Sequence, residues 1–290
     1  MITFIIALLV LVGGYFLYGS YVERVFGPDK IRKTPALTMA DGVDFIPLPT
    51  WKIFMIQFLN IAGLGPIFGA IMGALFGPVA FLWITFGTIF AGGVHDYLSG
   101  VISMKHDGTS VSEIVGIYLG DGMKKVMRVF SVILLILVGT VFVTSPAGLL
   151  TSMTGIDKNI WVVLIIIYYI VATVLPVDKV IGKIYPIFGA SLLFMAIGLA
   201  GAMIIGHFNG SMVMPEMTLQ NLHPSGLSIF PFLFTTIACG ALSGFHSTQS
   251  PMMARCINRE SESKRVGHVL VPNEIYEAII RDGYHILIEC

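Results

Sequence analysis

The sequence predicts an all-helical integral membrane protein with about seven transmembrane helices. Of its 290 residues, 56% are hydrophobic and only 12% are charged, whereas soluble domains carry about 25% charged residues. Three long stretches, residues 53–94, 129–156 and 184–206, contain no Asp, Glu, Lys, Arg or His. A helix needs about 20 apolar residues to cross a bilayer. Each of these stretches is therefore long enough to lie in a membrane.

The positions of lysine and arginine give the number and direction of the helices. Apolar segments occur near residues 2–18, 51–76, 79–104, 126–150, 160–175, 184–206 and 228–250. If the amino terminus lies outside, sixteen of the 17 Lys and Arg residues fall in inside loops, and Lys158 alone falls outside. Inside loops of membrane proteins carry such an excess of positive charge. Adding or removing one helix would destroy this asymmetry, so the seven helices and the outside amino terminus support each other.

These segments divide the chain into four parts. Residues 1–19 form an extra amino-terminal helix rather than a signal peptide, because no Lys or Arg precedes the apolar run and no clear cleavage site follows it. Residues 20–50 form a polar cytoplasmic loop, and residues 51–256 form a membrane core of six helices. Residues 257–290 are expected to form a polar cytoplasmic tail.

Composition and motifs exclude several classes of function. The net charge is zero, so no basic surface is available for nucleic acid. The three cysteines, Cys239, Cys256 and Cys290, are far apart, which argues against a disulfide framework or a cysteine zinc site. No phosphate-binding loop, dinucleotide fingerprint or His-Glu-x-x-His motif occurs. We therefore expect no enzyme activity, no cofactor and no metal, and any pumping must draw on an ion gradient or a partner.

The segment near residues 51–76 contains Gly63-Leu-Gly65-Pro66 in its middle. Proline removes a backbone donor and loosens the helix before it, and unpaired backbone at membrane depth is tolerated where it lines a cavity or is buried in protein. Pro66 can begin a second half-helix whose amino terminus attracts an anion. Gln57 and Asn60, about one turn earlier, are candidate polar contacts. The alternative is a proline-kinked helix whose glycines serve only close packing.

The end of the last apolar segment is unusually polar. Ser243, His246, Ser247 and Gln249 follow one another closely there, among several glycines. One interpretation is a second interrupted helix that lines the same cavity. The other is an ordinary helix that ends near Ser250, with Ser250-Pro251 capping a short interfacial helix. The spacing alone does not separate the two.

His95 and Asp96 lie within the third apolar segment, well before Lys105. An ionisable residue at that depth costs roughly 2.5–3.5 kcal/mol on insertion scales, so it is a candidate functional residue. A buried carboxylate beside an imidazole can hold a proton near neutral pH. The alternative is a structural aspartate that pairs with a Lys or Arg, or that reaches the membrane surface.

Four motifs in order resemble those of the carbon starvation protein A family. They are Asp-Gly-Val-Asp-Phe-Ile-Pro at residues 41–47, the Gly-Leu-Gly-Pro at 63–66, Val-His-Asp-Tyr at 94–97, and Gly-Phe-His-Ser-Thr-Gln-Ser-Pro-Met-Met-Ala-Arg at 244–255. The resemblance covers roughly residues 21–259. It implies a secondary transporter of the bacterial cytoplasmic membrane that takes up peptides or pyruvate-like carboxylates with protons during nutrient starvation.

The resemblance also implies a leucine-transporter-like inverted repeat. In that fold two five-helix repeats each begin with a discontinuous helix, and the solute sits between the two breaks. The breaks would fall in the segments near 51–76 and 228–250, which enter the membrane from opposite sides. The expected solute-binding residues are Asn60, Gly63, Gly65, Pro66, Ser243, His246, Ser247 and Gln249. The expected proton-coupling residues are His95 and Asp96.

The resemblance fades after about Glu262, so the second repeat is expected to be largely missing. A transporter that works by alternating access moves one repeat against the other. We therefore expect a truncated form, or half of a split transporter that needs a second chain for the missing helices. The first alternative function is a non-transporting membrane scaffold or sensor subunit. A channel, which would pass solute without a proton gradient, is the second.

Overall fold

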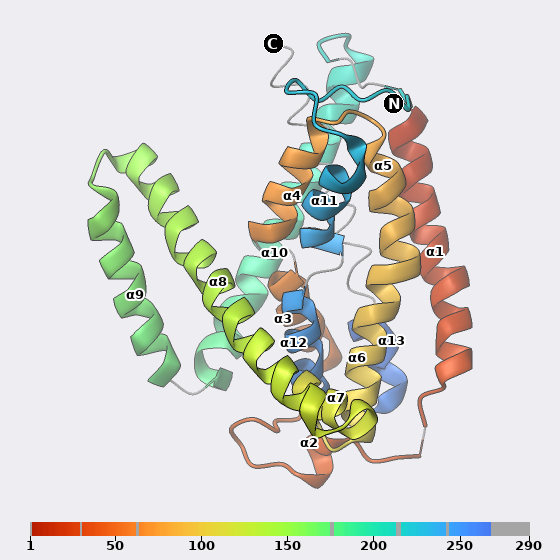
Figure 1. Ribbon diagram of the computed structural model, residues 1–290, viewed down its shortest axis with the longest axis vertical. Coiled ribbons are helices and arrows are strands. Elements are labelled where there is room, and N and C mark those ends of the chain that lie inside the picture. Colours follow the sequence, from red (N-terminus) through yellow and green to blue (C-terminus); the bar gives the residue numbers. More distant parts are fainter. Residues whose placement is uncertain are drawn as a thin grey trace.

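The computed structural model describes residues 2–29, 31–61, 64–174, 177–212, 216–241 and 244–267 (Figure 1). Almost all of the regular structure in these ranges is helical, and the one β-type contact found there is an isolated antiparallel bridge between Lys33 and Arg259. The predicted all-helical class is thus confirmed.

The helices fall in the order expected from the apolar segments. They are α1 (Ile2–Phe26), α2 (Pro35–Thr38), α3 (Thr50–Ile61), α4 (Leu64–Ala74), α5 (Ala80–Leu82), the π-helix η1 (Trp83–Gly92), α6 (Gly93–Lys105), α7 (Val111–Leu119), α8 (Asp121–Thr154), α9 (Lys158–Val174), α10 (Val177–Phe208), η2 (Ile229–Leu233), α11 (Phe234–Ala241), α12 (Gly244–Ala254), η3 (Glu260–Glu262) and α13 (Ser263–Gly267).

Three helices are long and apolar enough to cross a membrane by length and composition. They span Ile2–Phe26, Asp121–Thr154 and Pro186–Phe208. Two shorter apolar helices cover Lys158–Thr173 and Ile229–Ala238. These features support a membrane protein.

Two of the predicted segments each contain two helices in the structure. In the first, α3 ends at Ile61 and α4 begins at Leu64; in the second, α11 ends at Ala241 and α12 begins at Gly244. The residues between them, Gly63 and Ser243 among them, lie outside the described part of the chain. The four helices form two pairs, because α4 packs against α11, and α3 packs against α12 (Figure 1).

The third predicted segment is one long helical stretch with a π-helical middle. α5, η1 and α6 follow without a gap, and the Gly93 N–H donates to the carbonyl of Thr88, five residues back. π-Helical turns widen the helix and often occur at functional sites. The π-helix η1 ends at Gly92, so the local helix geometry changes just before His95 and Asp96, the candidate proton residues.

The bundle core consists of small clusters where several helices meet. One cluster joins Phe4 of α1 and Phe81 of α5 to Met203 of α10. Another lies between α1, α3, α6 and the end of α12, and its central members are Ile53 and Tyr97. In contrast, Ala147 is the one buried residue of α8, which forms an outlying hairpin with α9 (Figure 1).

One end of the molecule gathers the basic residues. α1, α6 and α12 end there, and α3 and α8 begin there (Figure 1). We call it the basic end, and its described Lys and Arg residues are Arg24, Arg32, Lys33, Lys52, Lys105, Lys124, Lys125, Arg128, Arg255, Arg259, Lys264 and Arg265. Lys158 lies at the start of α9, at the opposite end. The helix directions thus bring these twelve residues to one end, as the charge asymmetry predicted for them.

The expected tail begins as part of the folded bundle. Residues 257–267 form η3 and α13, and α13 packs against α6 and α3. Glu260 and Ser263 are buried, and Lys264 Nζ donates to Ser20 Oγ of α1 at 2.6 Å. The first eleven residues of the predicted tail therefore help to close the basic end.

Candidate functional site

A buried carboxylate with two imidazoles lies where α6 and α12 pack together. His95 Nδ1 lies 2.8 Å from Asp96 Oδ1, and His246 Nδ1 lies 3.6 Å from Asp96 Oδ2. The Asp96 and His246 side chains are 1% and 2% exposed, whereas His95 is one-third exposed. Asp96 and His246 lie 150 positions apart in the sequence, and the packing of α6 against α12 brings them together.

This arrangement bears on the alternatives for Asp96 that the sequence left open. Asp96 does not reach the surface, and no Lys or Arg of the described residues pairs with it; its ionisable neighbours are the two histidines. His246, which the sequence grouped with the solute-binding residues, lies next to the proton candidate Asp96. A carboxylate between two imidazoles can accept, share and release a proton.

A second buried polar contact joins α3 to α12. Gln57 Nε2 donates to Ser250 Oγ at 3.2 Å, and both residues are buried. Gln57 Oε1 has no hydrogen-bond partner among the described residues. A buried polar atom left unpaired costs about 1–3 kcal/mol, so this oxygen marks a place where a ligand or a moving donor could bind. Ser250 lies inside α12, which continues to Ala254, so the interpretation of a helix that ends at Ser250 is wrong.

A cavity of about 540 Å³ opens at the junction of α3, α8 and α12. Its size is typical of small-molecule sites, which enclose about 300–1,000 Å³. Asn60 lines it, one residue before the end of α3, and so does Phe245 at the start of α12. The other lining residues are Leu59, Leu135, Val138, Gly139, Phe142, Tyr168, Tyr169 and Phe188. The cavity thus lies beside the ends of both divided helices.

The remaining predicted site residues have the following positions. Gly65 and Pro66 lie in the first turn of α4, because that helix begins at Leu64 rather than at Pro66. Ser247 is buried in the first turn of α12, and Gln249 is partly buried, with its Nε2 3.4 Å from Thr248 Oγ1. Gly63 and Ser243 are outside the described residues.

Sequence reasoning missed the aromatic wall of the cavity. Tyr169 donates its hydroxyl to the Phe142 carbonyl at 3.1 Å, and the rings of Phe142 and Phe245 lie 6.1 Å apart. The adjacent tyrosines in the apolar α9 were the available signal, since a tyrosine hydroxyl in an apolar segment needs a hydrogen-bond partner. Within the described ranges, no group of three or more His, Cys, Asp or Glu side chains could hold a metal ion.

Comparison with known proteins finds a matching family model and several relatives of this chain. The family model described as carbon starvation protein CstA matches residues 1–152 and 143–280. An uncharacterized membrane protein of Haemophilus influenzae is 41% identical, over all of this chain and 90% of its own length. The peptide transporter CstA of Campylobacter jejuni is 30% identical over 88% of this chain and 45% of its own length. No solved structure matches.

A further relative is the pyruvate/proton symporter BtsT of Escherichia coli, which is 24% identical over 92% of this chain and 46% of its own length. The chain thus spans about half the length of the named transporters that it matches, but most of the Haemophilus protein. The family match continues to residue 280, beyond Glu262, where the resemblance was expected to fade. The chain belongs to the carbon starvation protein CstA family.

Proposed function

We propose that this protein binds the solute and the proton in a secondary transporter that takes up peptides or pyruvate-like carboxylates during nutrient starvation. Its relatives are named as peptide transporters and as a pyruvate/proton symporter. The observation that carries the proposal is Asp96 of α6 buried beside two histidines, one of which lies on α12, a helix that also borders a cavity of small-molecule size. The location would be the bacterial cytoplasmic membrane.

The proposed membrane arrangement has seven spans, with the amino terminus outside and the basic end in the cytoplasm. α3 with α4, and α11 with α12, would be the two discontinuous helices of a leucine-transporter-like inverted repeat. Residues 50–74 together are long enough to cross the hydrocarbon core, whereas α3 and α4 are each too short to cross it. Their antiparallel pairing with α12 and α11 supports this arrangement (Figure 1).

In this arrangement two half-helices present their amino termini to the middle of the bundle from opposite directions. α4 begins at Leu64 and runs away from the basic end, and α12 begins at Gly244 and runs toward it (Figure 1). Helix amino termini carry partial positive charge and exposed N–H groups, which suit a carboxylate. Peptides and pyruvate both carry one. Asn60, Gly63, Gly65, Pro66, Ser243, Ser247 and Gln249 remain the proposed solute contacts, and the cavity aromatics would accept an apolar part of a peptide.

Proton coupling is proposed to run through Asp96. An ionised Asp96 attracts a protonated His246 and holds α12 against α6, and neutralising the carboxylate weakens that attraction. Because α12 also borders the cavity, a proton on Asp96 would change the position of a solute-binding helix. His95, which is more exposed, would deliver the proton from water.

A binding assay on the purified protein tests the proposal. Labelled pyruvate or a labelled dipeptide should bind more tightly at about pH 6 than at about pH 8, by roughly tenfold for one coupled proton. Asp96→Asn should remove this pH dependence and leave binding at one intermediate affinity. Asp157→Asn, an exposed carboxylate in the turn before α9, is the matched control and should keep it. Saturable binding that stays pH-dependent in Asp96→Asn would exclude Asp96 as the proton site.

Transport itself is proposed to need further helices. In the proposed arrangement the described residues would supply one repeat and the first helix of a second, and the chain covers about half of the named transporters. This observation also favours the second candidate, a membrane scaffold or sensor subunit. Uptake into proteoliposomes under a pH gradient should be absent for this chain alone and present for the chain extended by its downstream reading frame or joined by a partner chain. Binding without uptake in either case would favour the sensor.

A further inference from the structure

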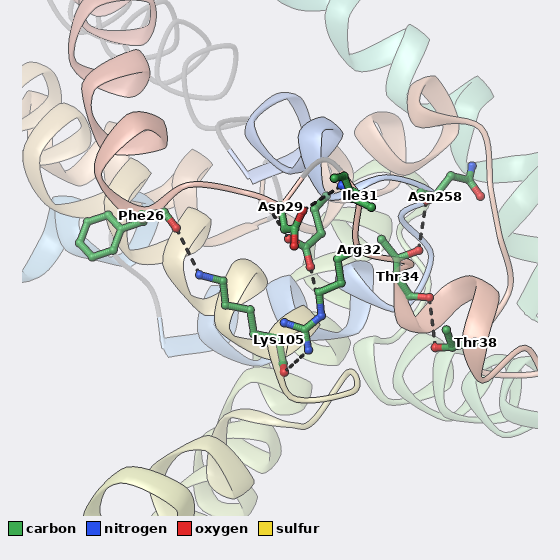
Figure 2. Close-up of polar contacts among 9 residues, drawn as sticks. Phe26, Asp29, Ile31, Arg32, Thr34, Thr38, Lys105 and Asn258 are labelled. Atoms are coloured by element: carbon green, nitrogen blue, oxygen red, sulfur yellow. Dashed lines mark hydrogen bonds and ion pairs between the residues drawn. The ribbon is translucent and has the colours of Figure 1, made fainter.

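The loop between α1 and α3 packs against the segment that follows α12. Both regions carry sequence motifs of the family resemblance, the Asp-Gly-Val-Asp-Phe-Ile-Pro at residues 41–47 and the arginine at the end of the 244–255 motif. Neither the 41–47 motif nor Arg255 lines the solute cavity or pairs with Asp96. Figure 2 shows part of their contact, in which loop residues meet Lys105 of α6 and Asn258 after α12.

The first group of contacts centres on a buried carboxylate. Glu260 is 1% exposed at its side chain, and its Oε2 accepts the Asp29 N–H at 2.8 Å. Arg32 Nε lies 3.7 Å from Glu260 Oε1, while Arg32 Nη2 donates to the Lys105 carbonyl at 2.9 Å (Figure 2). One arginine therefore joins the loop, the last turn of α6 and the segment after α12.

The second group of contacts centres on Phe45. The Asp41 carboxylate accepts the N–H groups of Val43, Asp44 and Phe45, which fixes the turn that presents the ring. The Arg255 guanidinium lies 5.1 Å from the ring centre, and its Nε donates to the Gly108 carbonyl at 2.7 Å.

Gly108 allows this close approach. It has a φ of +74°, and a Cβ there would lie 2.8 Å from the Phe45 ring. A side chain at this position would therefore strain the backbone and push the ring away.

Backbone contacts complete the attachment. The Leu48 N–H donates to the Cys256 carbonyl at 3.1 Å, and Asn258 Nδ2 donates to the Leu48 carbonyl at 2.7 Å. Thr34 Oγ1 donates to the Asn258 carbonyl at 3.2 Å (Figure 2). With the Lys33–Arg259 bridge, the loop follows the segment 255–260 along most of its length.

We propose that Asp29 and residues 31–48 form a latch that closes the basic end of the solute pathway, and that Arg32 with Glu260 and Phe45 with Arg255 hold it shut. The latch rests on the proposed transport function. Segment 255–263 directly follows α12, the helix that carries His246. Lys105 is the last residue of α6, the helix that carries Asp96. Any separation of α12 from α6 at this end must break the latch contacts. Pairs that are partly exposed are individually weak, so the latch can open reversibly.

Cys256 provides a reporter that does not depend on transport. It is 9% exposed and lies under the loop, and burial raises the pKa of its thiol. In a Cys239→Ser/Cys290→Ser background, the rate of maleimide labelling at a fixed pH measures how often the latch opens. Arg32→Gln and Phe45→Ala should each raise that rate by roughly two- to tenfold, and the double variant by more.

The matched control is Lys125→Gln, an exposed basic residue at the start of α8, which should leave the rate unchanged. An unchanged rate in a folded Arg32→Gln/Phe45→Ala variant would overturn the latch. Labelling that responds as expected while no solute binds would leave the latch standing and reject the transport function instead.

A second experiment tests closure directly and does not need a weakened protein. Residues paired in an antiparallel bridge have Cα atoms about 4.5–5.5 Å apart, a spacing that a disulfide can bridge. Lys33→Cys/Arg259→Cys, with the three native cysteines replaced by serine and with Ser247→Cys added, should form a disulfide on mild oxidation. Oxidation should slow labelling at position 247 from the basic end by about tenfold or more, and reductant should restore it. Equal labelling before and after oxidation contradicts the proposal.

Discussion

The contact between α6 and α12 and the hairpin of α8 and α9 are stabilised in different ways. In the first, the buried Asp96 of α6 reaches His246 of α12, and in the adjoining contact of α12 with α3, Gln57 donates to Ser250. In the hairpin most residues are exposed, and the Thr140 and Thr144 hydroxyls donate to carbonyls of their own helix. The bonds that join α9 to α8, from Tyr169 to the Phe142 carbonyl and from Trp161 to Thr154, lie on exposed residues. The first region is therefore joined by buried polar pairs, whereas the hairpin is mostly exposed apolar surface.

This difference separates two structural roles. A polar side chain in an apolar surrounding needs a partner, so a polar pair fixes which helices meet and at what height. Apolar side chains on a membrane helix can pack equally well against lipid and against another helix. The α6–α12 contact therefore determines one arrangement with specific chemistry, while α8 and α9 are suited to lipid or to further helices on their outer face.

The largest expected effect comes from removing the same side chain in the two regions. Ile53 of α3 is fully buried beside Tyr97 of α6, whereas Ile136 of α8 is 63% exposed. Ile53→Ala should destabilise the protein by about 2 kcal/mol or more through the cavity it leaves. Ile136→Ala should change stability by less than about 0.5 kcal/mol. Thermal unfolding in detergent measures both.

Equal destabilisation by the two substitutions would break the comparison. It would mean that α8 is packed against another chain in the sample, because a residue that faces only lipid or detergent has no protein contact to lose. Repeating the measurement across protein concentrations would then show whether α8 mediates assembly.

The sequence predicted the helices well because each apolar segment is a local property. Helix order, the basic residues at the ends of helices and the apolar sequence around Asp96 all follow from residues close together in the chain. The meeting of Asp96 with His246 was not predicted, since it depends on how α6 packs against α12. Patterns within one helix show that a side chain needs a partner, but they do not name the partner.

The same limit applies to the loop and to the start of the tail. Residues 20–50 and 257–290 were predicted to be polar and cytoplasmic, which their composition favours. Polar residues of the two regions also contact each other. Glu260 is buried in this contact, and Arg32 donates to the Lys105 carbonyl at the end of α6. Composition cannot distinguish polar residues that face water from polar residues that pair with each other across 200 residues of chain.

Gln57→Leu should have a smaller effect on stability, of either sign, and a separate effect on solute binding. It removes a buried amide oxygen that has no partner among the described residues, together with one hydrogen bond to Ser250. Stability should change by about 1 kcal/mol or less, and can increase, because the cost of the unpaired oxygen disappears. Solute binding should nevertheless weaken if this oxygen contacts the solute. Gln220→Leu, on the exposed loop before η2, is the control for both measurements.

Unchanged binding in Gln57→Leu would assign this glutamine a purely structural role between α3 and α12. A loss of stability well above 1 kcal/mol, with binding intact, would show that the amide oxygen is paired in the working protein.

The smallest expected effect lies at the corner where α7 meets α8. Glu113 pairs there with Lys124 and Arg128, and hydrogen bonds from both hold the pKa of its carboxyl below the usual value of 4.5. A lowered folded-state pKa means that the pair stabilises the protein above pH 4.5 and that this contribution is lost as the pH falls further.

Glu113→Gln should therefore lower the unfolding temperature slightly at neutral pH and not at low pH. Added salt should shrink the difference, because exposed pairs are screened. Asp121→Asn, an exposed carboxylate at the same corner, is the control. A pH-independent loss of unfolding temperature in Glu113→Gln would show that Glu113 acts through packing of the α7–α8 corner rather than through its charge. The corner would then stabilise the start of α8 more strongly than the exposed surface of the hairpin indicates.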